Sequence, residues 1–157
     1  MSQTTLDIKE PGLNVLPPGV ERHIVNAGGL TGLQIFPDDE IKIINDDGNQ
    51  ICEIICFDKD GKSELGILNL KENSENSFIK EILKRKDESC LATNLQLKKR
   101  NLNINKSKSS ILFNKETQSG EKVDIKSKDK CYVIFAAPQN DMLVNEQNPS
   151  SLSLIHI

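Results

Sequence analysis

Most hydrophobic residues of this chain lie in short runs that end at Gly, Pro, Asn or Asp. From residue 20 to about residue 70, the runs have the length of strands and turn residues separate them. The first three predicted strands cover residues 22–25, 32–36 and 40–45. In residues 40–45 polar and apolar side chains largely alternate, which is typical of a strand with one buried face.

An acidic turn, Asp46-Asp47-Gly48, is the clearest local signal. An Asp-Gly pair between two β-rich runs favours a tight hairpin, because both turn positions require positive φ. We therefore expect residues 40–45 and 49–57 to pair as a hairpin. The similar turn at residues 58–61 should then lead to a third strand at residues 65–70, which completes an antiparallel meander.

One helix is predicted, at residues 74–86, where Phe78, Ile79, Ile82 and Leu83 recur at helical spacing. Short strands are expected at residues 102–104, 110–113 and 123–125. Residues 131–137 are apolar on both faces, so they should form a central buried strand. The pattern predicts a mainly β protein: an antiparallel β-sandwich or a partly open barrel with one short helix.

The chain divides into three parts. Residues 1–19 should be an irregular lead-in, because Pro11-Gly12 and Pro17-Pro18-Gly19 interrupt both helix and strand. Residues 20–151 should form a single β-rich domain, since a chain of 157 residues is long enough for one core. Aromatic residues make up only 4% of the chain, so this core must consist of Ile, Leu and Val.

The last part, residues 152–157, has the sequence Leu-Ser-Leu-Ile-His-Ile. This string is the in-frame translation of a transposon-end adaptor used in sequencing libraries, so we expect it to be a library scar and the chain to be the truncated N-terminal piece of a longer protein. Such residues should not be required for folding. The alternative is an ordinary last strand in which Leu152 and Leu154 are buried. Because of the adaptor match, His156 is not considered as a ligand or a base.

Composition limits the function classes. Twenty basic and 23 acidic residues give a net charge of −3. The basic runs at residues 84–86 and 98–100 lack interleaved aromatic residues, so we expect no nucleic-acid partner. No apolar run is long enough to span a bilayer, and the N-terminus is not a signal peptide. Four scattered cysteines form no disulfide framework, which favours the cytoplasm.

The cysteines also indicate packing rather than chemistry. Cys52 and Cys56 share one face of a predicted strand, roughly 13 Å apart, which is too far for two ligands of one zinc ion. His23 could in principle activate Cys90 or Cys131. However, neither thiol is predicted to lie at a helix N-terminus or beside a cationic cluster, where thiol pKa values fall. We expect no catalytic residue and no metal ligand.

Glu53 breaks the pattern of its strand, which is otherwise apolar on both faces. A buried carboxylate is costly unless it is paired. One interpretation is that its face is partly exposed. The other is that Glu53 lines a pocket with Asn49 and Gln50, held by Arg22 or Lys42. Asn49, Gln50 and Glu53 are therefore weak ligand-binding candidates.

Residues 40–53 resemble the opening hairpin of the urea-carboxylase-associated domain family, with matches at Gly48, Asn49, Gln50 and the acidic residue Glu53. Residues 135–149, from Phe-Ala-Ala-Pro to Gln-Asn-Pro, are similar to the end of the same domain. Enzymes of the family carry a Gly-Arg-His-Asp type segment and a nearby cysteine, which suggest a metal. Residues 91–130 contain nothing of that kind, so this chain resembles a branch without the catalytic apparatus.

The resemblance also implies a context. Such domains occur ahead of aminomethyltransferase domains like those of the glycine-cleavage T-protein. We therefore expect an N-terminal, non-catalytic accessory domain whose partner is the downstream domain of the same chain. Tetrahydrofolate would bind in that domain, and no cofactor is expected in this fragment. The alternatives are a stand-alone enzyme acting on a carboxylated guanidine or urea derivative, and a small-molecule or protein binding module.

Overall fold

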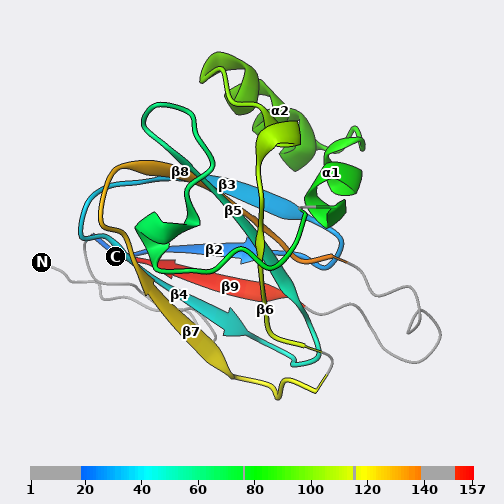
Figure 1. Ribbon diagram of the computed structural model, residues 1–157. Coiled ribbons are helices and arrows are strands. Elements are labelled where there is room, and N and C mark those ends of the chain that lie inside the picture. Colours follow the sequence, from blue (N-terminus) through cyan, green and yellow to red (C-terminus); the bar gives the residue numbers. More distant parts are fainter. Residues whose placement is uncertain (1–18, 76, 115, 139–150) are drawn as a thin grey trace, which may run out of the picture.

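The computed structural model describes residues 19–75, 77–114, 116–138 and 151–157. Two antiparallel four-stranded sheets lie face to face, and two helices cover the outer face of the second sheet (Figure 1). The strand order is β2-β9-β4-β7 in the first sheet and β3-β8-β5-β6 in the second. In the described residues the sheets do not close into a barrel. The predicted mainly β fold is confirmed as a β-sandwich.

The first sheet consists of β2 (Glu21–Val25), β4 (Glu40–Asn45), β7 (Lys122–Lys126) and β9 (Leu152–His156). The second consists of β3 (Leu30–Ile35), β5 (Cys52–Asp58), β6 (Ser110–Leu112) and β8 (Cys131–Ala136). The helices are α1 (Ser77–Leu83) and α2 (Glu88–Lys99), and two short 3₁₀ helices are η1 (Leu65–Leu68) and η2 (Ile104–Lys106). None of the described helices is long and apolar enough to cross a membrane.

Two hydrophobic clusters hold the layers together. Between the sheets, β4 contributes Ile41 and Ile43, which pack with Ile54 of β5 and Phe135 of β8. On the other side of the second sheet, alternate residues of the same two strands pack against the helices. These outward residues are Ile55, Phe57, Tyr132, Ile134 and Ala136. Strands β5 and β8 are therefore buried on both faces, as predicted for residues 131–137.

The predicted hairpin of residues 40–45 and 49–57 is wrong. Strand β4 pairs with β7 and β9, whereas β5 pairs with β6 and β8 in the other sheet. The turn also differs from the expected one: positive φ is found at Gly48 (φ 81°) and Asn49 (φ 62°), and not at both residues of the Asp47-Gly48 pair. The chain crosses between the sheets because β5 is apolar on both faces. A hairpin with the half-exposed β4 would leave one of those faces in water.

Gly48 cannot be replaced easily in this crossing. A Cβ atom at this position would lie 2.8 Å from the amide nitrogen of Ser119 and 2.8 Å from the carbonyl oxygen of Thr117. Both contacts are with backbone, so the neighbouring segment would have to move. The glycine therefore serves the close approach of two chain segments as well as the positive φ.

Two other predicted strands are also wrong. Residues 65–70 form η1, where Leu65 and Leu68 are both buried at a spacing of three residues, and Asn69 ends the turn with φ 58°. The segment that follows β5 pairs with this strand only at one isolated β-bridge, between Phe57 and Ser63. Residues 102–104 lead into η2 rather than a strand.

The single predicted helix at residues 74–86 is shorter than expected, and a second helix was missed. Helix α2 carries no simple apolar stripe, because Leu91 and Leu95 are exposed and the polar Thr93 is buried. Its N-terminus does show a recognisable signal: the Asp87 carboxylate accepts a hydrogen bond from the amide of Cys90 at 3.0 Å. Arg85, between the helices, donates to the carbonyl of Gly28 at 2.6 Å.

The terminal residues form a central strand. Strand β9 pairs with β2 on one side and β4 on the other, and Leu152 and Leu154 are fully buried between the sheets. Both interpretations of this segment allow a strand, so its adaptor origin stays a prediction. The position of β9, which joins β2 to the sheet, weighs against the expectation that the segment is not required for folding, and that expectation stays an untested prediction. The predicted lead-in, except Gly19, lies outside the described residues.

Replacing Leu154 with Ala should lower the free energy of unfolding by about 2–5 kcal/mol, because the substitution leaves a cavity in a well-packed core. For a domain of this size, that loss corresponds to a fall of about 5–15 °C in melting temperature. Ile157→Ala is the control, because Ile157 is 47% exposed and follows the strand. Thermal unfolding followed by circular dichroism tests this. Similar melting curves for the two variants would show that β9 is not packed as described.

Candidate functional site

The three predicted ligand-binding candidates have different contacts. The backbone of Asn49 donates to the carbonyl of Thr117 at 2.8 Å. The side-chain amide of Gln50 donates to the carbonyls of Ile51 and Pro138 at 2.9 and 2.8 Å, which ties the start of β5 to the end of β8. These are contacts that stabilise the crossing between the sheets. A ligand at Asn49 or Gln50 stays an untested prediction.

Glu53 is fully buried on the face of β5 that the helices cover. Its Oε1 accepts a hydrogen bond from the amide of Ile79 at 2.8 Å. Its Oε2 accepts from the hydroxyls of Ser74 and Ser109, at 3.1 and 3.0 Å. The carboxylate thus holds α1 and the residue before β6, Ser109, against β5. A negative charge at the N-terminal end of a helix is also favoured by the helix dipole.

Two expectations about Glu53, its partly exposed face and its cationic partners, are therefore wrong. A partly exposed face is wrong, because the residue is 0% exposed. The expected cations, Arg22 and Lys42, belong to β2 and β4 of the other sheet and are not its partners. Neutral donors hold the carboxylate instead, which satisfies the rule that buried charges are paired or hydrogen-bonded.

The cysteines pack as predicted for Cys52 and Cys56, which share the inner face of β5 and are both fully buried. Burial raises the pKa of Cys52. A hydrogen bond between the thiols of Cys56 and Cys131 raises the pKa of Cys56 and lowers that of Cys131. This contact joins β5 to β8. No local pattern predicts it, because the two residues are far apart along the chain.

The expectation that Cys90 does not lie at a helix N-terminus is wrong. It lies in the first turn of α2, although no helix was predicted there. Burial, followed by the hydrogen bond with Asp87 and the negative charge of that residue, raises its pKa to about 11. The thiol is therefore protonated at neutral pH and is a poor nucleophile. The polar contact of His23 is with Glu21 rather than with a thiol.

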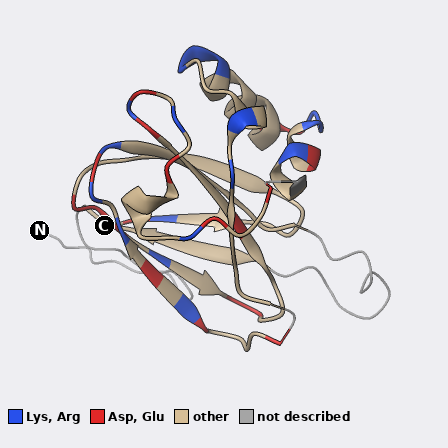
Figure 2. Cartoon of the chain, in the orientation of Figure 1, with Lys and Arg blue, Asp and Glu red and all other residues tan. Residues whose placement is uncertain are grey.

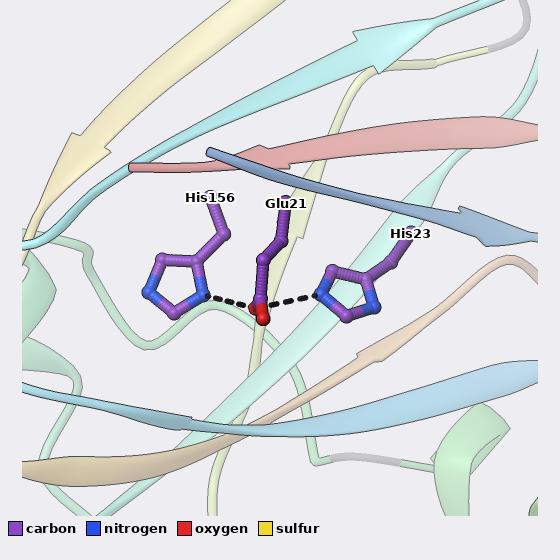
Figure 3. A group of neighbouring side chains, drawn as sticks. All are labelled: Glu21, His23 and His156. Carbon is purple, nitrogen blue, oxygen red and sulfur yellow. Dashed lines mark ion pairs between the residues drawn. The ribbon is translucent and has the colours of Figure 1, made fainter. Parts of the chain in front are cut away.

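A cluster of ionisable side chains lies between the sheets at one end of the sandwich (Figure 3). Glu21 and His23 are two apart on β2, and His156 of β9 is paired with Glu21 across the sheet. Glu21 Oε1 lies 3.5 Å from His23 Nε2 and 3.6 Å from His156 Nδ1. One potential ligand atom from each residue lies within 4.8 Å of the others. The cluster is the only such group among the described residues.

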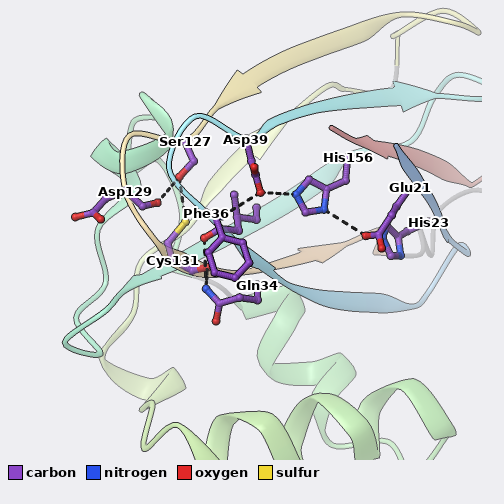
Figure 4. A network of polar contacts seen from close by, with 10 residues as sticks. Glu21, His23, Gln34, Phe36, Asp39, Ser127, Asp129, Cys131 and His156 are labelled. Atoms are coloured by element: carbon purple, nitrogen blue, oxygen red, sulfur yellow. Dashed lines mark hydrogen bonds and ion pairs between the residues drawn. The ribbon is translucent and has the colours of Figure 1, made fainter. Parts of the chain in front are cut away.

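The turn between β3 and β4 supports this cluster (Figure 4). Asp38 has φ 70° and follows Pro37, so residues 36–39 form a tight turn closed by a 3.1 Å bond from the Asp39 amide to the Phe36 carbonyl. Asp39 Oδ2 accepts from the Phe36 amide at 3.1 Å and lies 2.8 Å from His156 Nε2. The carboxylate therefore fixes the orientation of the His156 ring.

Two imidazoles and a carboxylate in this arrangement can share a proton or bind a divalent metal ion. Sequence reasoning missed the cluster because it set His156 aside and had no register for β2 against β9. One local signal was present: an acidic residue and a histidine two apart on a strand, as Glu21 and His23 are, share a face.

A separate surface hollow of about 330 Å³ lies beside the end of α2. Its lining includes Arg100, whose guanidinium lies 4.7 Å from the ring centre of Tyr132 and donates to Gln34. The surrounding helical region, residues 77–106, has eight Lys or Arg and three Asp or Glu, and Figure 2 shows basic residues on both helices and the segments that flank them. The negative net charge of the chain therefore comes from residues outside this region.

Comparison with known proteins gives one distant relative. The chain is 29% identical over 144 residues to the trimethylamine-oxide aldolase of Ruegeria pomeroyi (strain ATCC 700808 / DSM 15171 / DSS-3). The alignment covers 92% of this chain but only 18% of the aldolase, so the chain spans less than one fifth of that relative. No protein-family model matches the chain. The comparisons thus do not confirm the resemblance to the urea-carboxylase-associated family.

Replacing Glu53 with Leu should lower the melting temperature. The substitution leaves the amide of Ile79 without its acceptor, and a buried donor without a partner costs about 1–3 kcal/mol. Glu72→Leu, at an exposed position, is the control for added hydrophobicity. Thermal unfolding of both variants measures the effect. An unchanged or higher melting temperature for Glu53→Leu would instead support the pocket interpretation, in which function keeps Glu53 at a cost in stability.

Proposed function

We propose that this chain is the N-terminal, non-catalytic accessory domain of a folate-dependent aminomethyltransferase-like protein. One observation carries the proposal: nearly the whole chain aligns with less than one fifth of a much longer enzyme. A unit of domain size that matches part of a longer polypeptide is what an accessory domain would look like. The relative is named for an oxidised methylamine, and the aminomethyltransferase resemblance implies an amine or methyl donor that binds in the following domain.

The chemistry of the fragment agrees with a supporting role. The Glu53 carboxylate already accepts three hydrogen bonds from the protein. Burial raises the pKa of Cys52 and of Cys90. We therefore assign tetrahydrofolate and the amine substrate to a downstream domain of the same chain, which is also the proposed partner. The four cysteines are free, which supports placing the protein in the reducing cytoplasm.

A second candidate function is a stand-alone enzyme acting on a carboxylated guanidine or urea derivative. The cluster of Glu21, His23 and His156 favours it, because three ligands with an open position are typical of hydrolytic metal sites. This candidate ranks second, since His156 lies in the segment predicted to be an adaptor. Ammonia release from such a substrate by the zinc-loaded chain would favour it over the accessory role. A plain binding module, using the hollow beside Arg100, is the third candidate.

The gene should continue past codon 151 when its natural locus is recovered from the source DNA. We expect an open reading frame that adds a domain several times longer than this chain. Long-read sequencing across the junction makes the measurement. A stop codon within a few residues of position 151 would contradict both the adaptor origin and the accessory role.

If that domain is present, the full-length protein should carry the transferase activity and bind tetrahydrofolate, whereas residues 1–157 alone should do neither. Equilibrium binding of tetrahydrofolate to the two proteins compares them directly. The fragment must first show a cooperative melting transition, so that a lack of binding reflects a missing site rather than an unfolded chain. Tetrahydrofolate binding to the folded fragment would contradict the division of roles.

A further inference from the structure

The register of two strands places the side chains of Glu21, His23 and His156 together. Residues 21 and 23 alternate with residue 22 along β2, so their side chains leave the same face of the sheet. Glu21 is paired with His156, and both point toward the second sheet in Figure 3. Further along the same face, Val25, Leu152 and Leu154 belong to the core between the sheets. The cluster therefore lies where the core opens to solvent.

The spacing of the ligand atoms suits one metal ion. A zinc ion about 2.0–2.2 Å from each nitrogen and oxygen, in tetrahedral geometry, requires ligand atoms about 3.4 Å apart. The two measured separations from Glu21 Oε1 are 3.5 and 3.6 Å, and all three ligand atoms lie within 4.8 Å of one another. Only a small movement of side chains would bring them to the required distances.

His156 is oriented for this role by Asp39. Because the Asp39 carboxylate can only accept, His156 Nε2 is the donor in the 2.8 Å contact, and Nδ1 is left with a lone pair that faces Glu21. A carboxylate behind a histidine fixes the tautomer and the ring orientation of metal-bound histidines generally. Asp39 is itself held by the Phe36 amide. The His156 side chain is 13% exposed, so its position is well defined by packing.

His23 provides a second, independent observation. Its Nε2 atom is shielded from solvent and makes no hydrogen bond within the described residues. The 3.5 Å approach to Glu21 is an ion pair only when the ring is protonated. A buried polar nitrogen without a partner is rare and costly in a folded protein. A metal ion between His23 and Glu21 would satisfy it.

We propose that Glu21, His23 and His156 form a binding site for one divalent transition-metal ion, and zinc is one of the metals that two imidazoles and a carboxylate bind. Three protein ligands leave one tetrahedral position open to water or to a small anion. Glu21 is 68% exposed, so ions and small ligands reach the site from the solvent side.

The proposal concerns the polypeptide of this sequence. Glu21, His23 and Asp39 all precede the six terminal residues, and two of them, Glu21 and Asp39, are in contact with position 156. The environment of that position is therefore set by the preceding part of the chain. Removing the tail is not a usable test, because β9 would be lost with it.

Isothermal titration of the 157-residue chain with ZnCl₂ tests the site. We expect one zinc ion per chain and a rise in melting temperature with metal, because a ligand that binds only the folded state stabilises it. His23→Ala should abolish that stoichiometric binding. Asp39→Asn, which preserves shape but weakens support for His156, should lower affinity by about 10–100-fold. Asp124→Asn, an exposed carboxylate on β7, should bind as the unaltered chain does.

Glu21→Gln keeps the test decisive if His23→Ala fails to fold, since this exposed side chain can be changed without disturbing the core. Its zinc affinity should fall while its metal-free melting curve stays unchanged. Substoichiometric zinc binding by the unaltered chain, or equal affinity in folded Glu21→Gln and unaltered protein, would overturn the proposal. Neither result depends on the downstream gene, so the metal site and the accessory role fail or succeed separately.

Discussion

Two strands that are apolar on both faces, β5 and β8, impose the arrangement of the whole domain. Each must be covered twice, once by a sheet and once by another layer, because burial of apolar surface contributes about 25 cal/mol per Å². The first sheet covers one face, and α1 and α2 cover the other. A small two-sheet sandwich therefore becomes a three-layer structure, although its sequence contains few aromatic residues to fill the layers.

Glu53 is the exception within this constraint, and it gives the third layer a defined position. Hydrophobic contact alone would let α1 slide over β5, since apolar burial is non-directional. Three hydrogen bonds to a buried carboxylate are directional and fix one register of helix against strand. A residue that the sequence pattern marks as a misfit can thus be the one that specifies how two layers meet.

Local sequence patterns predicted most strands but not the strands with which they pair. Residues 131–137 and 40–45 were recognisable because their apolar pattern depends on burial, which the fold confirms. The hairpin prediction failed because the Asp47-Gly48 pair indicates a turn, not which sheet the next strand joins. Helix α2 was not predicted because its buried face includes the polar Thr93. The cluster at Glu21 and His23 required long-range register, which no local pattern contains.

The order of strands in the first sheet has a consequence for synthesis on the ribosome. Of the described strands β2 is made first and β9 last, yet they are direct neighbours, with Arg22 and Ser153 separated by 131 positions along the chain. At about 5–20 residues per second, β2 waits many seconds for its partner. During that time its unpaired edge and the inner face of β4 are open to other nascent chains. Chaperone capacity and translation speed should therefore influence the yield of folded domain.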